Sequence, residues 1–282
     1  MYHKAPFNYI GNKHRIIGFL EALFPKDIST FVDLFCGGGD VLINIRAATK
    51  IANDVNYHLI EIMEEFQRLD VDDVLCQIQS RIHEWGLNKT DAEAFYKFRS
   101  YYNKTRRPLD LYVLVCFGFN YQFRFNSRHE FNNPFGKNRS CFSENMRKNL
   151  ISFVELIRDV TFSKCDFRDV ELDNLKKGDF VYADPPYTLT CGAYNDGKRG
   201  FKGWSLADDT DLTAILDRLN EKGVAFAFSD VIEHKGKIHP FLSDWAKDKN
   251  YNIHYLDVDY NNCNYQNRNC EHSTIEVVIT NY

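Results

Sequence analysis

The tetrapeptide Asp184-Pro185-Pro186-Tyr187 presents a carboxylate, a proline carbonyl and an aromatic ring within four residues. It follows an apolar run, residues 180–183, which predicts a buried strand. The prolines have no N–H to donate, so they end the sheet ladder there. Ligands of open α/β sheets bind at the carboxyl ends of strands. The tetrapeptide can therefore hold an exocyclic amino group, with two acceptors for its two hydrogens and a ring to stack on its base. The alternative is a plain turn with a solvated Asp184.

Three other motifs lie nearer the N-terminus. A predicted strand runs into Gly37-Gly38-Gly39, a turn that either lets a ligand approach the backbone closely or is only a tight turn. Asp54 follows Gly37 by 17 residues, close to the spacing at which an acidic residue binds ribose hydroxyls. A helix N-cap is the other reading of Asp54, and the two roles can coexist. Lys13 follows a Gly-Asn turn at the start of a predicted helix, where it points into a pocket or lies on the surface.

The elements that must position these motifs follow from the apolar pattern. Strands and helices alternate in the first part of the chain, which implies a parallel sheet with right-handed crossovers. We expect early strands over residues 30–35 and 50–53, and helices over residues 16–24, 41–48 and 58–67. We expect later strands over residues 160–163, 180–183, 224–229, 253–258 and 274–280, and a helix over residues 206–221.

Residues 70–150 interrupt this order. They show helical periodicity over residues 71–82 and 91–103, and no clean period over residues 118–140. The formal net charge of the chain is −4, which argues against a general nucleic-acid binder. Residues 97–148, however, hold eleven Lys and Arg against three acidic residues, interleaved with aromatic residues and Asn. Such an asymmetry is typical of a surface that binds a polyanion, and the alternative is a solvated helical face.

Composition excludes several classes of protein. No run of 18 apolar residues is present, which argues against a transmembrane helix, and the first six residues lack the apolar core of a signal peptide. The eight cysteines contain no C-x-x-C pair, so we interpret them as reduced thiols and expect no disulfide frame, no zinc site and a cytoplasmic location.

Together the motifs resemble the Dam-like, D12 class N6-adenine DNA methyltransferases over nearly the whole chain. The resemblance implies an α/β fold with a Rossmann-like sheet, mostly parallel, with one antiparallel strand near the C-terminus. It implies a catalytic domain of residues 1–56 and 160–282 and an inserted, mainly helical target-recognition domain of residues 57–159. The segments that carry it are, in order, residues 8–13, 33–39, Asp54, residues 165–167, 184–187 and 276–282.

The resemblance also implies a pocket for S-adenosylmethionine and no metal. Tyr9, which stands where the family usually has Trp, and Lys13 would flank the cofactor. Asp54 would bind its ribose, and Asp184 would lie between the cofactor and the target base. The remaining implied contacts are Phe35, Gly37 and Gly39 along the cofactor, and Asp166 and Phe167 at its adenine.

Residues 118–136 resemble the family's DNA-reading loop. Arg124 would pair with a guanine edge, Phe119 would wedge into the base stack, and Asn120 would contact a phosphate or the orphaned partner base. Family members that read GATC tend to have small and apolar residues where this chain has Tyr121 and Gln122. Further candidate DNA contacts are Gln122, Asn126, Asn132 and Pro134, the last of these against a thymine methyl group.

The expected reaction transfers a methyl group from S-adenosylmethionine to N6 of a flipped adenine in double-stranded DNA, at GATC or a related short site. Asp184 and the Pro185 carbonyl would accept the two amino hydrogens, Pro186 would complete the turn, and Tyr187 would stack on the base. Three alternatives stay open: methylation of RNA adenine or of cytosine N4, a catalytically silent DNA-binding module, and a nucleotide-dependent oxidoreductase. We expect a monomer, no membrane partner, and a cognate restriction endonuclease as a functional partner.

Overall fold

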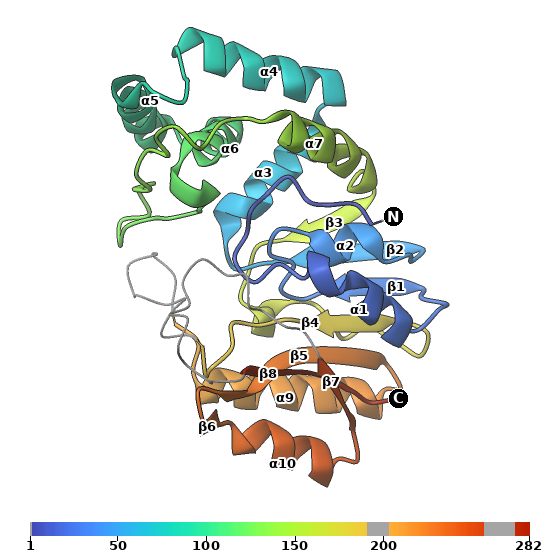
Figure 1. Cartoon of the computed structure of the whole chain (residues 1–282). Coiled ribbons are helices and arrows are strands. Elements are labelled where there is room, and N and C mark those ends of the chain that lie inside the picture. Colours follow the sequence, from blue (N-terminus) through green and yellow to red (C-terminus); the bar gives the residue numbers. More distant parts are fainter. Residues whose placement is uncertain (1, 191–202, 257–273) are drawn as a thin grey trace.

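The computed structural model describes residues 2–190, 203–256 and 274–282, and the structural statements below concern these residues. Its centre is one sheet with strand order β3-β2-β1-β4-β5-β8-β7, in which β6 pairs with β5 (Figure 1). The strands from β1 to β5 pair in parallel, and β8 runs antiparallel to both β5 and β7. The strands are β1 (Thr30–Asp33), β2 (Thr49–Asn53), β3 (Val160–Ser163), β4 (Phe180–Ala183), β5 (Ala225–His234), β6 (Lys237–Ile238), β7 (Asn252–Leu256) and β8 (Thr274–Thr280).

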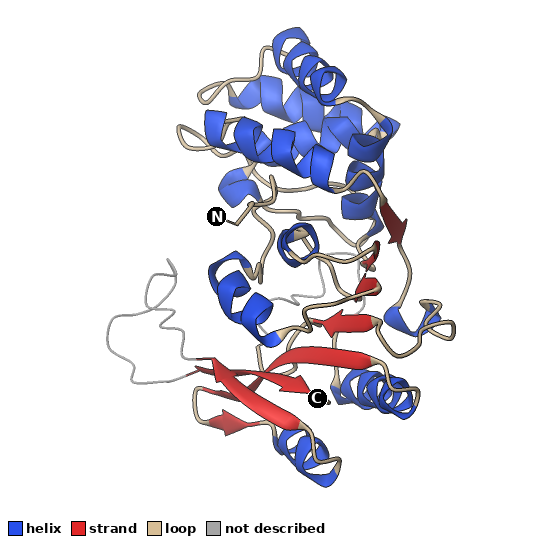
Figure 2. Ribbon diagram, turned by 90° about the vertical axis from the view of Figure 1, so that its right-hand side faces the viewer, coloured by secondary structure: helices blue, strands red, loops and turns tan. Residues whose placement is uncertain are grey.

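Helices cover both faces of this sheet, and five α-helices, α3 to α7, lie between β2 and β3 in sequence (Figures 1 and 2). This arrangement confirms the expected Rossmann-like α/β class with a mostly parallel sheet and an antiparallel strand near the C-terminus. The helices are η1 (His14–Ile16), α1 (Ile17–Leu23), α2 (Asp40–Asn44), α3 (Tyr57–Arg68), α4 (Val71–Glu84), α5 (Ala92–Thr105), α6 (Pro108–Phe117), η2 (Phe119–Tyr121), α7 (Glu144–Leu156), η3 (Phe167–Asp169), α9 (Leu206–Glu221) and α10 (Pro240–Asp248).

Each face of the sheet carries its own hydrophobic core, because successive strand residues point to opposite sides. On β4, Phe180 and Tyr182 belong to the core that contains α1, α2 and α3, whereas Val181 belongs to the core that contains α9 and α10. Burial on both faces explains why β4 appears in the sequence as a continuous apolar run, without the alternation of a half-exposed strand.

The helices between β2 and β3 share the first of these cores. The ring of Phe7 in the N-terminal segment lies 6.0 Å from that of Phe66 in α3, 5.7 Å from that of Tyr112 in α6 and 5.6 Å from that of Phe153 in α7. The helical segment is therefore packed directly onto the N-terminal segment that carries Tyr9 and Lys13.

Some predicted elements differ from the observed ones. Three α-helices, α6, α7 and α10, were not predicted. Helix α6 was missed because every residue from Leu109 to Phe117 is buried, which removes helical periodicity. Strand β5 continues five residues beyond the predicted end at Ser229, through the buried polar pair Ser229 and Asp230. The last two residues of the strand predicted over residues 253–258 lie outside the described residues.

Candidate active site

A cavity of about 300 Å³ opens at the carboxyl ends of β1, β2 and β4. Its wall joins segments that are far apart in sequence: the N-terminal motif, the glycine turn, the end of β2 and the tetrapeptide after β4. All four predicted catalytic residues line it. So do the predicted cofactor residues Tyr9, Lys13, Phe35, Gly37, Asp54, Asp166, Phe167 and Asp184.

Lys13 lies at the centre of a buried polar cluster beneath this cavity. Its Nζ is 2.8 Å from Asp184 Oδ2 and 3.5 Å from Glu276 Oε1, and its side chain is only 7% exposed. The Tyr187 hydroxyl lies 2.7 Å from Asp184 Oδ1 and 2.9 Å from Glu276 Oε1. Two carboxylates, one ammonium group and one phenol therefore form a single connected group. The interpretation of Lys13 as a surface residue is excluded.

Burial raises the pKa of Asp184, and Lys13 opposes this rise by its charge and its hydrogen bond. The charge of Glu276 adds to the rise, whereas the hydrogen bond from Tyr187 opposes it. Glu276 was not predicted as a site residue, because it lies on β8, 89 residues after Tyr187, and only the sheet pairing brings it to the end of β4.

The two prolines of the tetrapeptide face different surroundings. Pro185 is buried and Pro186 is exposed, and both line the cavity. The backbone carbonyl of Pro185 receives no hydrogen bond from the part of the chain that the structure describes. A carboxylate and a carbonyl that needs a donor are thus adjacent in the chain at the cavity wall.

Asp54 fixes the conformation of the glycine turn by a hydrogen bond. Asp54 Oδ2 accepts a hydrogen bond from Gly37 N at 2.9 Å, and its Oδ1 accepts one from Asn56 N at 2.8 Å, so it also caps the turn that leads into α3. A Cβ atom on Gly37 would lie 3.1 Å from the Tyr9 ring, and Gly37 has φ +47°. Glycine is therefore required here by both the conformation and the contact with Tyr9.

Gly39, the other predicted cofactor glycine, lies outside the cavity wall. A Cβ atom on it would meet the ring of Phe153 in α7 at 3.1 Å. Gly39 allows close packing against α7, and as the N-cap of α2 it has a left-handed φ of +84°. Asp33, in contrast, lines the cavity although it was not predicted to bind anything.

Asp33 is 1% exposed, and neither of its carboxyl oxygens has a hydrogen-bond partner among the residues described. Burial raises its pKa well above the usual range, and the charges of Asp184 and Asp54 add to this effect. An acid with no polar partner is costly to bury. Asp33 lies at the end of β1, in the cavity wall.

Three aromatic rings pack together at another part of the cavity wall. The ring centroids of Phe35, Phe167 and Trp204 lie 5.3 to 5.5 Å apart in all three pairs. Trp204 was not predicted, although it directly precedes Ser205, whose capping box with Asp208 begins α9. An aromatic residue directly before the N-cap of a predicted helix is the signal that could have identified it.

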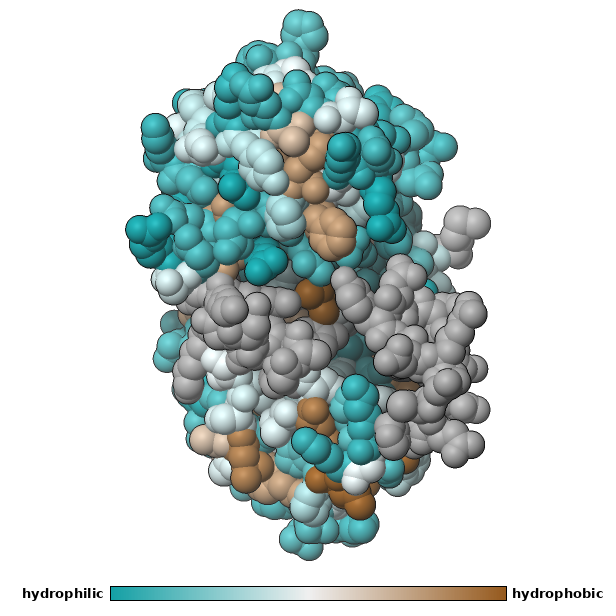
Figure 3. Space-filling model, turned by 60° about the vertical axis from the view of Figure 1, so that its left-hand side comes forward, coloured by the Kyte–Doolittle hydropathy of each residue, from teal (hydrophilic) through white to brown (hydrophobic). Residues whose placement is uncertain are grey.

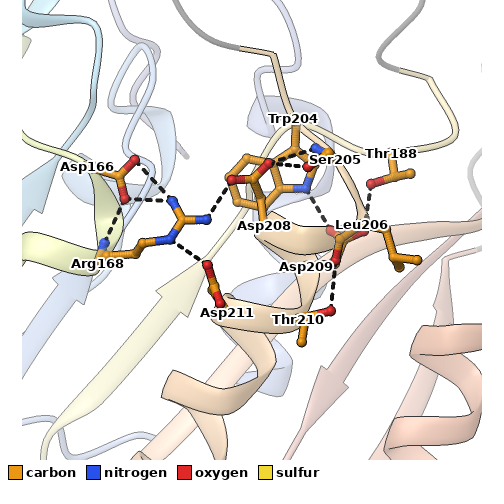
Figure 4. A network of polar contacts seen from close by, with 10 residues as sticks. All are labelled: Asp166, Arg168, Thr188, Trp204, Ser205, Leu206, Asp208, Asp209, Thr210 and Asp211. Carbon is orange, nitrogen blue, oxygen red and sulfur yellow. Dashed lines mark hydrogen bonds and ion pairs between the residues drawn. The ribbon is translucent and has the colours of Figure 1, made fainter.

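Arg168 fixes the residues around these rings, as Figure 4 shows. Its guanidinium donates to Asp166 Oδ1 at 2.9 Å, to Asp208 Oδ1 at 2.6 Å and to Asp211 Oδ2 at 2.7 Å, and it stacks over the Phe167 ring at 4.3 Å. The same figure shows Asp209, which accepts hydrogen bonds from Trp204 Nε1 and Thr188 Oγ1, both at 2.6 Å. These contacts tie the motif after β3 to the start of α9.

The predicted DNA-reading loop folds back on itself beside the cavity. Isolated antiparallel bridges join Gly118 to Phe135 and Phe125 to Phe131. Phe123 and Phe125 are buried and line the cavity, while Arg124 between them is partly exposed. Along this short extended stretch, alternate side chains therefore point inward and outward. The Arg124 guanidinium has no ion-pair or hydrogen-bond partner among described residues.

The other predicted DNA contacts divide into two groups. Phe119, at 37% exposure, and Pro134 are exposed, Gln122 and Asn120 are partly exposed, and Asn120 has a left-handed φ of 52°. Asn126 is already used inside the loop, where its Oδ1 accepts from the backbone of Arg128 and Glu130. The Oδ1 atom of Asn132 is buried and has no hydrogen-bond partner among the residues described, while its backbone N donates to Arg124 O at 3.0 Å.

The loop touches the N-terminal motif. Asn8 Nδ2 donates to the backbone oxygen of Asn120 at 3.1 Å, and the rings of Tyr9 and Phe123 pack edge to face at 5.9 Å. The surface formed by the helical half of the molecule is mostly hydrophilic in Figure 3. Several basic side chains of residues 97–148 are exposed there, including Lys104, Arg107, Arg128, Lys137 and Arg139.

Within the described ranges, no group of three or more His, Cys, Asp or Glu side chains is arranged to hold a metal ion. Cys36, Cys76, Cys116, Cys141 and Cys165 are free thiols. No helix in the described part of the chain has both the length and the apolar character needed to cross a membrane.

Comparison with known proteins agrees with this geometry. The model of the family "D12 class N6 adenine-specific DNA methyltransferase" matches residues 9–264. The chain is 48% identical over 283 residues to modification methylase StsI of Streptococcus sanguinis and 46% identical to type II methyltransferase M.FokI of Planomicrobium okeanokoites. Both matches cover 100% of this chain and 43% of the relative, so the chain spans less than half the length of these two proteins. It is 25% identical to a DNA adenine methylase of Escherichia coli, over 81% of each chain.

Proposed function

The chain belongs to the D12 class of N6 adenine-specific DNA methyltransferases, and on this basis we propose that it transfers a methyl group from S-adenosylmethionine to N6 of adenine in double-stranded DNA. One observation carries the proposal: Asp184 and Pro185 are adjacent at the wall of the cavity, and the Pro185 carbonyl accepts no hydrogen bond from the described residues. Adenine N6 is a weak nucleophile because its lone pair is delocalised into the ring. Two acceptors on its two hydrogens localise that lone pair and fix its direction.

The residues of the cavity fit S-adenosylmethionine. When bound, this cofactor supplies an electrophilic methyl group on a sulfonium centre. Asp33 has a buried carboxyl group with no hydrogen-bond partner in the described part of the chain, which suits an amino group or a cation of the cofactor. Phe35, Phe167 and Trp204 form an aromatic surface for its adenine, next to Asp166, while Asp54 and the Gly37 turn would hold its ribose and methionine portions.

Duplex DNA would lie against residues 57–159, which we propose as the target-recognition domain, with residues 1–56 and 160–282 as the catalytic domain. Arg124 would read a guanine edge, because its guanidinium has no partner among the described residues and the neighbouring Phe123 and Phe125 lie in the cavity wall. Phe119 would enter the base stack, with Asn120, Gln122 and Pro134 beside it. Tyr187 would stack on the flipped adenine. Basic side chains on the same half would neutralise phosphates.

We further propose that the chain acts as a monomer in a restriction–modification setting. The relatives described as a modification methylase and a type II methyltransferase support this setting. A cognate restriction endonuclease would then share its recognition site. The DNA adenine methylase relative makes GATC one candidate for that site, and the bulky Tyr121 and Gln122 point to a related sequence.

The direct test supplies the purified chain with labelled S-adenosylmethionine and matched substrates: duplex DNA, single-stranded DNA and RNA. Methylated positions are then mapped in DNA from cells that express it. We expect label in duplex DNA, confined to adenines in one short sequence. Label in RNA alone, label on cytosine, or cofactor binding without any transfer would each contradict the proposal.

A further inference from the structure

Three oxygen atoms of the polar cluster stand in a row. The Tyr187 hydroxyl oxygen lies between Asp184 Oδ1 at 2.7 Å and Glu276 Oε1 at 2.9 Å, both within hydrogen-bond distance. A phenol carries one proton, so it can donate fully to only one of two carboxylates. The row is therefore one proton short of two complete hydrogen bonds. One of the two carboxylates can therefore accept an additional proton.

The proposed methyl transfer releases one proton, and we propose that this row carries it from adenine N6 through Asp184 and the Tyr187 hydroxyl to Glu276. This inference rests on the proposed function and deepens it, because it assigns a role to Glu276, a strand residue that was not predicted as a site residue. Glu276 then acts through Tyr187 and does not touch the base, so it is a positioning and proton-accepting residue.

The atoms and electrons balance. The N6 lone pair forms the bond to the methyl carbon, and the carbon–sulfur bond breaks with its electron pair staying on sulfur. As positive charge develops on N6, one of its protons moves to the Asp184 carboxylate. That proton passes to the Tyr187 oxygen while the phenolic proton moves to Glu276 Oε1. N6 ends neutral with one hydrogen and one methyl group, Asp184 is again ionised, and Glu276 is neutral.

The surroundings favour uptake of a proton by this row. Before reaction, Asp184 and Glu276 carry two negative charges against the single positive charge of Lys13. The Glu276 side chain is 6% exposed, so water screens these charges poorly. Two further buried carboxyl groups, Asp33 and Asp230, have their pKa values raised well above the usual range by burial first and by neighbouring acids second. One more proton reduces the excess negative charge of the whole region.

The test compares single-turnover methyl transfer in the wild type and in Glu276→Gln at saturating cofactor and DNA. Gln keeps an acceptor oxygen for Tyr187 but cannot take up the proton. We expect a rate roughly 100-fold lower, with a larger slowing in D₂O than the wild type shows. Glu276→Asp should recover part of the rate, because it restores a carboxylate. Tyr187→Phe combined with Glu276→Gln should be no slower than Tyr187→Phe alone, since both changes interrupt one path.

Glu233→Gln is the matched control: it makes the same substitution on the neighbouring strand β5, at a side chain without a partner among described residues. Thermal unfolding should show that every single variant of Glu276 is folded, and the separate affinities for S-adenosylmethionine and DNA should match the wild type. A Glu276→Gln rate within about twofold of the wild type would overturn the inference. So would a loss that came from weaker binding, or one without a change in the D₂O effect. A wild type that transfers no methyl group would instead refute the proposed function.

Discussion

Removal of the Lys13 ammonium group should slow methyl transfer, because it favours the protonated form of Asp184. In Lys13→Met the side chain keeps its length and apolar stem but leaves Asp184 and Glu276 together without their shared cation. At 2.8 Å, and with an effective dielectric constant of about 20, the Lys13–Asp184 attraction is about 6 kcal/mol before desolvation is subtracted. Measured losses for breaking a buried pair by removing one partner are about 3–5 kcal/mol.

The variant can avoid this cost by protonating Asp184. Burial already raises the pKa of Asp184 and Lys13 opposes the rise, so loss of Lys13 raises that pKa further. A protonated Asp184 is a weaker hydrogen-bond acceptor for the N6 amino group than the carboxylate. A penalty of about 3 kcal/mol corresponds to a rate roughly 150-fold lower. Because Asp184 is active as the carboxylate, the rate should fall as pH decreases through the pKa of Asp184. In Lys13→Met this fall should occur at higher pH than in the wild type.

The assay follows tritium transfer to duplex DNA in a single turnover across the neutral and alkaline range. Lys97→Met serves as the control, because Lys97 is 67% exposed on α5 and pairs with Glu93 on the same helix. We expect a slow variant whose rate recovers as pH rises, and a control close to the wild type. If Lys13→Met matched the wild type in rate and in pH profile, the buried pair would have no part in the reaction.

Three further changes test other parts of the site. Arg124→Ala should reduce discrimination among single-base variants of the recognition site by about 1–3 kcal/mol per lost pairing, in competition assays; full discrimination would make Arg124 a phosphate or structural residue. Trp204→Ala should weaken S-adenosylmethionine binding by about 1 kcal/mol in calorimetry, through the lost ring contact, and unchanged affinity would remove Trp204 from the cofactor site. Asp33→Asn should weaken cofactor binding but raise the free energy of unfolding at neutral pH by on the order of 1 kcal/mol. The folded pKa of Asp33 is raised, so its stabilising effect is present at low pH and is lost as pH rises through that value; denaturant unfolding at several pH values would show whether Asn removes this dependence.

Elements with a distinctive local signal were predictable from the sequence. Strand β4 has the predicted bounds, because an apolar run buried on both faces meets two prolines that end it. Helix α9 also has the predicted bounds, since Ser205 and Asp208 form a capping box at its start. In contrast, α6 is buried all round, so its sequence is compatible with either a strand or a helix.

Predictions for the site followed the same division. The residues of the N-terminal motif, the glycine turn, Asp54 and the tetrapeptide meet at one cavity, as expected for the carboxyl ends of parallel strands. Glu276 and Trp204 were missed because their partners are distant in sequence and depend on how β8 and α9 pack. A sequence of three glycines does not reveal which of them line the cavity, as Gly37 and Gly38 do, and which one packs against α7, as Gly39 does.

The central claim is that Asp184 directs methyl transfer to adenine N6. Its most direct test incubates duplex DNA with labelled S-adenosylmethionine and either the wild type or Asp184→Ala, and identifies the modified base by mass spectrometry after digestion of the DNA. The account predicts N6-methyladenine with the wild type and none with Asp184→Ala, while thermal unfolding shows that the variant is folded. Equal transfer by the two proteins, or a product other than N6-methyladenine, would contradict it.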